Sequence, residues 1–250
     1  MFNRFRKQAE AEFSPVTASV PPLTGVPSGL VSLTKAAAVS LEKRGLTGQR
    51  AAVYLVVDRS YSMKDYFANG SVQHLADQVL GLSANLDDDS TVPLVMFDNR
   101  PYPVVEISLD RYQGVVADQH RMHGGEISMG GTMYVPAMNA VIKHHHDSGA
   151  TDPAFVIFQT DGAPQDHDAT RLLLAQASTK PIFWSFLGFG RNKVDFLQQL
   201  DKMRGRLVDN ASYFHAGADP RGLTDAAVYD GITQEFGTWL AAARAKNLLP

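Results

Sequence analysis

Short, continuously apolar segments recur along the chain, and each has the length of a β-strand. They are residues 51–57 (AAVYLVV), 92–97 (VPLVMF), 154–159 (AFVIFQ) and 181–189 (PIFWSFLGF). Strands that are buried on both faces have this pattern, which is typical of a parallel sheet covered by helices. The segment 102–108 follows the second strand closely, so it is expected to be the edge strand of a hairpin. A final strand is expected at about 207–214.

Segments with helical spacing of apolar residues alternate with these strands. The first helix is expected at residues 30–43, with Gly45 as a stop signal. Further helices are expected at residues 72–86, 135–146, 169–178, 193–203 and about 224–245. This alternation predicts an α/β fold with three layers, a doubly wound, mostly parallel six-stranded sheet with one antiparallel edge strand.

The chain is expected to consist of one domain preceded by an arm. The stretch FSPVTASVPPLTGVPSG at residues 13–29 contains four prolines, which argue against regular structure. We therefore expect a flexible, proline-rich arm at residues 1–27 and a single domain at residues 28–250.

Composition excludes several classes of partner and chemistry. The formal net charge of -3 gives no general attraction to nucleic acid or to an anionic membrane. No apolar run approaches the roughly 18 residues that a membrane span needs. The absence of cysteine excludes disulfides and thiolate metal sites, and it is compatible with a reducing compartment. A cytoplasmic protein without a membrane span or a nucleic-acid partner is expected.

Polar side chains follow the first and third of the long apolar strands, at the point where each strand ends. Asp58, Ser60 and Ser62 come after the first strand, and Asp161 comes after the strand at 154–159. Thr132 stands behind two glycines at the entrance of a predicted helix. Ligands of an open parallel sheet bind at the carboxyl ends of its strands. Two carboxylates and three hydroxyls are therefore expected at one end of the sheet.

The chemistry of these side chains favours a hard divalent cation. Oxygen-only coordination suits Mg²⁺, Ca²⁺ or Mn²⁺ and disfavours Zn²⁺ or Cu²⁺. Mg²⁺ keeps several of its waters, so a few hydroxyls with two nearby carboxylates suffice and one position stays open for a ligand. Taken alone, Asp58, Ser60 and Ser62 would also serve as a helix cap. Their combination with Thr132 and Asp161 favours the cation site.

Three short motifs, DRSYS (58–62), GGTMY (130–134) and QTDGAP (159–164), resemble the metal-ion-dependent adhesion site of the von Willebrand factor A family. The resemblance implies that Ser60, Ser62 and Thr132 coordinate the cation, that Asp58 and Asp161 hold its waters, and that a carboxylate of a bound partner completes the shell. One departure is residue 61, a tyrosine where the family usually has glycine. A residue other than glycine restricts the backbone there.

Further sequence segments, from VSLTKAAAVSLEKRGL (31–46) to LVDNASYF (207–214), resemble the A domains associated with bacterial tellurium-resistance and related stress gene clusters. The resemblance covers residues 29–242. It implies a cytoplasmic, cation-dependent adaptor that binds a protein partner in a stress response, with Mg²⁺ as the expected cation and Mn²⁺ or Ca²⁺ as alternatives. The partner-binding rim around the cation is expected to consist of Arg59, Tyr61, Met63, Met129, Met133 and Tyr134.

Two alternatives remain. A Mg²⁺-dependent phosphatase would use Asp58 as its nucleophile, but such enzymes carry a second Asp two residues on, where this chain has Ser60. A metal-free scaffold protein would bind partners without any cation. Because no nucleophile stands beside a recognisable base, we expect no enzyme activity. Asp98, after the second strand, is expected to be a turn residue, and the histidines at 144–146 a solvated helix end.

Overall fold

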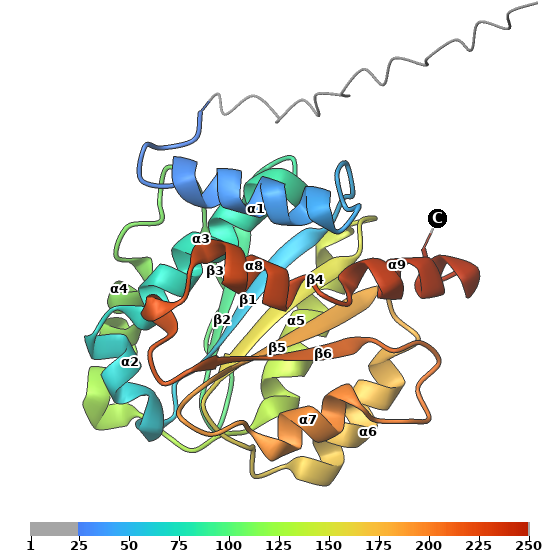
Figure 1. Cartoon of the computed structure of the whole chain (residues 1–250). Coiled ribbons are helices and arrows are strands. Elements are labelled where there is room, and N and C mark those ends of the chain that lie inside the picture. Colours follow the sequence, from blue (N-terminus) through green and yellow to red (C-terminus); the bar gives the residue numbers. More distant parts are fainter. Residues whose placement is uncertain (1–24, 250) are drawn as a thin grey trace, which may run out of the picture.

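The computed structural model describes residues 25–249 and contains one six-stranded sheet with the strand order β3-β2-β1-β4-β5-β6 (Figure 1). The strands are β1 (Ala52–Asp58), β2 (Val92–Phe97), β3 (Val105–Ile107), β4 (Ala154–Thr160), β5 (Ile182–Phe189) and β6 (Ala211–Gly217). All neighbours pair in parallel except β2 and β3, which are antiparallel. The predicted doubly wound sheet with one antiparallel edge strand is confirmed.

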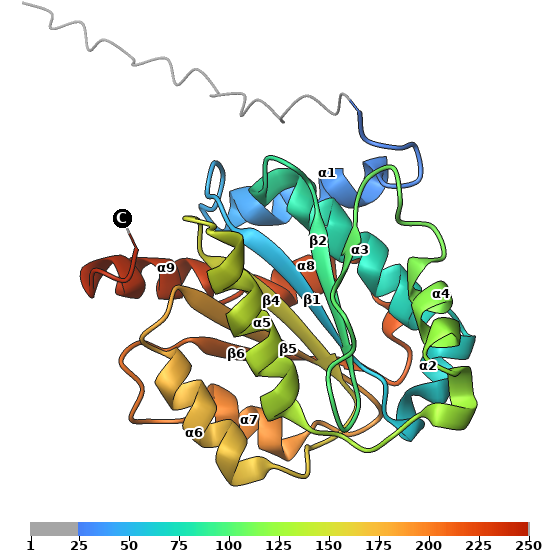
Figure 2. The same ribbon diagram turned by 180° about the vertical axis from the view of Figure 1, so that it is seen from behind.

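Helices cover both faces of the sheet (Figures 1 and 2). They are α1 (Val31–Lys43), α2 (Lys64–Ala68), α3 (Ser71–Leu86), α4 (Val115–Met122), α5 (Tyr134–Ser148), α6 (His167–Ala177), α7 (Asp195–Asp201), α8 (Asp225–Ile232) and α9 (Phe236–Ala245), with short 3-10 turns η1 (Tyr61–Met63), η2 (Gly125–Ser128) and η3 (Pro220–Gly222). Helices α1, α3, α8 and α9 share one apolar core with the sheet, and α5, α6 and α7 share the other.

The strand β1 shows why the apolar runs in the sequence are continuous. Its residues Val53, Leu55 and Val57 belong to the first core, whereas Tyr54 and Val56 belong to the second. Successive side chains of a strand point to opposite faces, so a strand covered on both sides needs an apolar residue at every position. This burial holds β1 at the centre of the sheet and fixes where its carboxyl end lies.

Three expected elements differ from the structure. The edge strand expected at 102–108 is only the three residues of β3, Val105–Ile107. The last strand, expected at about 207–214, begins only at Ala211, because residues 207–210 form an irregular segment that leads into it. The single helix expected at 224–245 is two helices, α8 and α9. The hydroxyl of Ser185 on β5 donates to the carbonyl of Ile232 at 2.9 Å, and α8 ends at that residue. The ring of Phe236 at the start of α9 stacks on Phe155 of β4 at a centroid distance of 4.3 Å.

The N-terminal arm expected at residues 1–27 lies outside the described residues, apart from 25–27. Within residues 25–249, no helix is long and apolar enough to cross a membrane.

Candidate metal centre

Three chain segments converge at the carboxyl end of the sheet. Strands β1 and β4 are neighbours, with Val57 opposite Gln159, so Asp58 at the end of β1 lies beside Thr160 at the end of β4. The third segment is the loop that leads into α5, which contains Thr132. The five residues expected to form the cation site thus come from three chain segments at the carboxyl end of the sheet.

Asp58 is fully buried and held by two hydrogen bonds. Its Oδ1 accepts from the backbone N–H of Ser60 at 2.7 Å, and its Oδ2 accepts from the Thr160 hydroxyl at 2.6 Å. Burial disfavours the charged form and raises the pKa of Asp58 to about 7, although these hydrogen bonds act in the opposite direction. A nearby cation would favour the carboxylate, so the residue suits a site whose charge is balanced by a bound metal.

The hydroxyls of Ser60 and Ser62 lie between the two carboxylates. Their Oγ atoms are 3.2 Å apart, and Ser62 Oγ donates to Asp161 Oδ1 at 2.9 Å. Burial also raises the pKa of Asp161 above its usual range. The alternation of Ser60 and Ser62 around one intervening residue places both hydroxyls on the same side of the turn, where they converge with Asp161.

The Thr132 loop is joined to both of the other segments by its backbone. The carbonyl of Gly130 accepts from Tyr61 N at 3.1 Å, and the carbonyl of Thr132 accepts from Gln165 N at 2.8 Å. The carboxylate of Asp166 then accepts from the first two N–H groups of α5, at 3.0 and 2.9 Å, and caps that helix. Within residues 25–249, the hydroxyl of Thr132 forms no hydrogen bond, so its lone pairs are available to a ligand.

The donor set fits a hard cation such as Mg²⁺ or Mn²⁺. It consists of neutral hydroxyls and two carboxylates, and no group of three His, Cys, Asp or Glu side chains that could hold a metal occurs in the described part of the chain. These residues therefore do not form a zinc site of the kind that uses nitrogen or sulfur ligands.

The glycine at position 130 is required by close packing and not by backbone conformation, because its φ is not positive. A Cβ at this position would lie 2.9 Å from Asn99 Nδ2 and 3.0 Å from Asp98 Cγ. We expect Gly130→Ala to push the Thr132 loop away from β1 and to weaken Mn²⁺ binding. The expected loss is about tenfold or more, because replacing residues that position metal ligands lowers metal affinity by this amount.

Calorimetric titration with Mn²⁺ measures this effect, and Gly162→Ala is the matched control. Gly162 stands next to Asp161, but a Cβ there would meet nothing within 4 Å. Equal affinities of the two variants would show that the close packing at residue 130 does not support the site.

The expected rim is only partly present at the surface. Tyr61 is 62% exposed, and Met129 and Met133 are half-buried, so these three side chains remain available to a partner. The other three expected rim residues, Arg59, Met63 and Tyr134, are fully buried, and their assignment to the rim is wrong.

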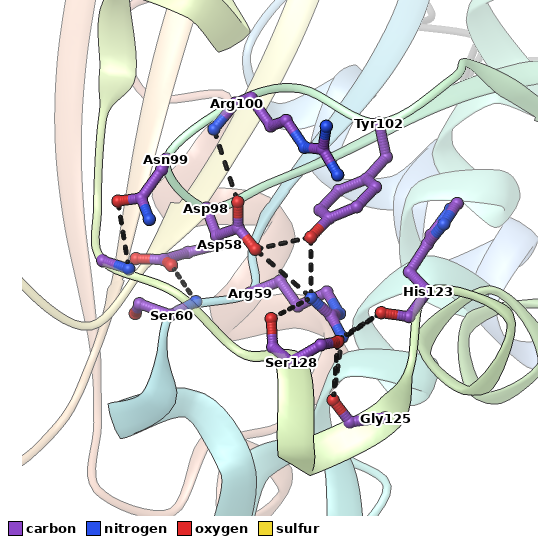
Figure 3. A network of polar contacts seen from close by, with 11 residues as sticks. Asp58, Arg59, Ser60, Asp98, Asn99, Arg100, Tyr102, His123, Gly125 and Ser128 are labelled. Atoms are coloured by element: carbon purple, nitrogen blue, oxygen red, sulfur yellow. Dashed lines mark hydrogen bonds and ion pairs between the residues drawn. The ribbon is translucent and has the colours of Figure 1, made fainter.

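Each of the three buried residues has a physical reason to point inward. Met63 belongs to the first apolar core, and its sulfur accepts from Gln159 Nε2 at 3.3 Å. Tyr134 packs in the second core, and its hydroxyl donates to the carbonyl of Gly162. Arg59 extends into a polar cage instead of toward solvent (Figure 3).

Tyr61 occupies its position without backbone strain. Among the described residues, only Ser90 and Asn247 have a positive φ outside glycine, so the backbone at residue 61 is of a kind that any residue adopts. The Nζ of Lys64 lies 5.8 Å from the centroid of the Tyr61 ring. The departure from the usual glycine therefore leaves the backbone of the site intact and adds an exposed ring beside it.

Asp98 lies in the turn after β2, as the sequence predicted, but it is buried and bonded in a way that the sequence did not indicate. It is 4% exposed and accepts hydrogen bonds from Arg59 and from the hydroxyl of Tyr102. Its place after an apolar strand, as with Asp58, was the one available signal. The histidines at the end of α5 are not all solvated either, because His145 is buried and bonds to the carbonyl of Asp152.

Comparison with known proteins identifies the family of the chain and relatives of its fold. The chain is 31% identical over 220 residues to the uncharacterized protein YcbR of Bacillus subtilis (strain 168), covering 86% of this chain and 88% of that protein. Among solved structures, manganese-loaded TRAP protein of Plasmodium vivax matches with a TM-score of 0.50 and 18% identity over 75% of this chain and 73% of that chain.

Proximal thread matrix protein 1 from the mussel byssus also matches with a TM-score of 0.50, at 13% identity, over 73% of this chain but only 46% of that chain. At these identities the solved structures show the fold alone. The profile of the vWA-TerF-like family, described as the vWA domain found in the TerF C terminus, matches residues 50–249. The chain therefore belongs to the vWA-TerF-like family of von Willebrand factor A domains.

Proposed function

We propose that this protein is an adaptor that holds a divalent cation at Asp58, Ser60, Ser62, Thr132 and Asp161 and uses it to bind an acidic group of a protein partner. The observation that carries the proposal is a pair of hydrogen bonds, from Ser60 to Ser62 and from Ser62 to Asp161. They bring oxygen atoms that can bind a metal together from the ends of two strands. Mg²⁺ is the proposed cation, with Mn²⁺ and Ca²⁺ as alternatives of the same coordination chemistry.

The balance of charge supports capture of a carboxylate. When bound, the cation supplies a Lewis-acidic position that an additional oxygen ligand can fill. The protein contributes three neutral hydroxyls and two carboxylates, and one of these, Asp58, is already engaged by Ser60 N and Thr160. Because Asp58 and Asp161 are proposed to hold the waters of the cation, only neutral oxygens contact the cation itself, and an acidic side chain of the partner is the direct ligand that its charge favours.

The surface around the site offers apolar contact to such a partner. Tyr61, Met129 and Met133 are the side chains of the expected rim that remain accessible, and aromatic residues and methionine are enriched in protein interfaces. The ring of Tyr61 is the most exposed of the three. We propose that these residues select the partner while the cation captures its carboxylate.

The proposed role is binding and not catalysis. A phosphoryl-accepting aspartate must reach its substrate, whereas Asp58 has no exposed surface and both of its oxygens accept hydrogen bonds. The phosphatase alternative requires Mg²⁺-dependent turnover of a small phosphate ester by the purified protein, and absence of turnover is the expected result.

The biological setting that we propose is a bacterial stress response of the tellurium-resistance type, inside the cell. It is supported by membership of the vWA-TerF-like family. The manganese-loaded state of the similar Plasmodium protein supports the choice of a divalent cation.

Affinity capture from the native cell extract, with and without EDTA, tests the proposal together with metal analysis of the purified protein. We expect partners that are retained with Mg²⁺ and released by EDTA, and that are lost with Thr132→Ala. The control is Thr179→Ala, which changes an exposed threonine at the opposite end of the sheet. Partners that persist in EDTA and with Thr132→Ala would instead indicate the metal-free scaffold.

A further inference from the structure

Arg59 is a fully buried arginine between two residues of the proposed cation site, Asp58 and Ser60. Its guanidinium group is enclosed by acceptors from two other parts of the chain (Figure 3). Nη2 donates to the carbonyls of His123 and Gly125, both at 2.8 Å, and to Ser128 Oγ at 2.7 Å. Nη1 is shared among Tyr102 Oη at 2.9 Å, the carbonyl of Ser128 at 3.3 Å and Asp98 Oδ2 at 3.3 Å.

Three of these acceptors are backbone carbonyls in residues 123–128, the segment that runs directly into Gly130 and Thr132. Apart from the short turn η2, this segment has no regular secondary structure between α4 and α5. The side chain of Arg59 therefore satisfies carbonyls that a helix or a strand would otherwise satisfy. It ties the loop that carries Thr132 to the strand end that carries Asp58.

The charge of Arg59 is matched by Asp98 and not by the site carboxylates. Asp98 Oδ2 also accepts from Tyr102 at 2.5 Å, and its Oδ1 accepts from Arg100 N at 3.3 Å. These bonds occupy Asp98, although it lies close to Gly130. The pairing thus keeps a third carboxylate away from the cation while it neutralises a buried positive charge next to it.

We infer that Arg59 is a positioning residue, whose side chain sets the place of Thr132 relative to Ser60 and Ser62 and so determines whether Thr132 can act as a ligand. This inference rests on the proposed cation site. A lysine at this position would keep the charge. Its single ammonium nitrogen, however, cannot reach both the carbonyls of residues 123–128 and Asp98, which the two terminal nitrogens of the planar guanidinium contact. The geometry of the guanidinium, and not its charge alone, is therefore required.

Two variants test the inference with Mn²⁺ as the probe. Arg59→Lys keeps the charge and removes the planar guanidinium group. The double variant with Arg59→Met and Asp98→Asn removes both charges and leaves no unpaired ion, while the amide oxygen introduced at position 98 can still accept from Tyr102. The readouts are Mn²⁺ affinity, the number of waters on bound Mn²⁺ from water-proton relaxation, and hydrogen exchange of residues 123–132 in the metal-free protein.

We expect both variants to bind Mn²⁺ about tenfold or more weakly, as is found when residues that position metal ligands are replaced. We also expect faster hydrogen exchange of the backbone amides of residues 123–132. We also expect about one additional water on Mn²⁺, because water replaces the hydroxyl of Thr132. A general loss of stability would not change the number of waters. If the double variant fails to fold, Arg59→Lys decides the outcome.

Arg206→Met is the matched control. Arg206 is also a buried arginine, with 3% of its side chain exposed, and it binds the carbonyls of Asp201 and Met203 before β6, at the opposite end of the sheet. Its replacement should lower thermal stability and leave Mn²⁺ affinity and hydration unchanged.

Wild-type affinity and hydration in a folded Arg59→Lys variant would overturn the inference. Absence of Mn²⁺ binding to the wild-type protein would instead overturn the proposed function. In that case unchanged hydrogen exchange in the variants would also exclude a loop-fixing role of Arg59, and faster exchange would establish one.

Discussion

Replacement of Asp58 by asparagine is expected to abolish binding of Mg²⁺ and Mn²⁺ and, at the same time, to stabilise the metal-free protein. Asparagine has the same shape, so its Oδ1 can accept from Ser60 N and its Nδ2 can donate to Thr160 Oγ1. The Thr160 hydroxyl can then donate to the carbonyl of Gly162, which lies 3.1 Å away. The variant removes a buried charge and keeps a hydrogen bond at each of the two side-chain positions that Asp58 uses.

The expected gain depends on pH, and its sign follows from the raised pKa. Burial raises the pKa of Asp58 from 3.8 to about 7. Between these values the folded protein holds a proton that the unfolded chain has lost, so the free energy of unfolding falls as pH rises through this window. Above pH 7 the folded state carries the full cost of the buried charge, which is on the order of 4 kcal/mol for a shift of this size.

Chemical denaturation in EDTA at pH 8 and at pH 4 measures this effect. We expect Asp58→Asn to be more stable than the wild-type protein by up to about 4 kcal/mol at pH 8 and by much less at pH 4. A variant that is less stable than the wild-type protein at pH 8 would show that the carboxylate supports the metal-free fold, contrary to this account.

Replacement of Thr132 by alanine is expected to act on cation binding alone. Thr132 is half-buried and its hydroxyl forms no hydrogen bond within residues 25–249, so the replacement should change the free energy of unfolding by less than about 0.5 kcal/mol. As a proposed direct ligand, it should contribute at least as much to affinity as a supporting residue does. We therefore expect Mn²⁺ affinity to fall by about 10 to 100-fold or more.

Thr132→Ser is the conservative variant for this experiment, because it keeps the hydroxyl and removes only a methyl group. Calorimetric titration should show Mn²⁺ affinity close to that of the wild-type protein for Thr132→Ser and weakened binding for Thr132→Ala. Equal affinities of the alanine variant and the wild-type protein would exclude Thr132 as a ligand.

The sheet and the place of the site could be predicted because both depend on local sequence patterns. Strands covered on both faces must be apolar at every position, so β1, β2, β4 and β5 are visible as continuous runs. Ligand groups at the ends of parallel strands follow directly from those runs. The positions of Asp58 and Asp161 therefore needed only the strand boundaries.

The surroundings of the site could not be predicted, because they depend on contacts between distant segments. A charged residue after a strand usually points to solvent, yet Arg59 is buried by backbone carbonyls of residues 123–128. Backbone carbonyls leave no signature in the sequence. The cap of α5 by Asp166, a residue more than 30 positions away, was hidden for the same reason.

Two positions near the site differ in the room that they leave for a side chain. Tyr61 has no positive φ and is exposed, so the backbone of the turn accommodates a large side chain at the surface. Gly130, by contrast, packs against Asp98 and Asn99 and cannot accept a Cβ without a shift of its neighbours. A larger side chain is thus accommodated at residue 61, which faces solvent, and clashes at residue 130, where two loops touch.

The most direct test of the cation site is an anomalous difference map from crystals of the full chain grown with Mn²⁺, recorded at the manganese edge. The account predicts one strong peak within bonding distance of the hydroxyl oxygens of Ser60, Ser62 and Thr132. Asp58 and Asp161 should contact waters that are bound to the ion and not the ion itself. Absence of a peak among these three hydroxyls, at Mn²⁺ concentrations that load other sites, would contradict the account.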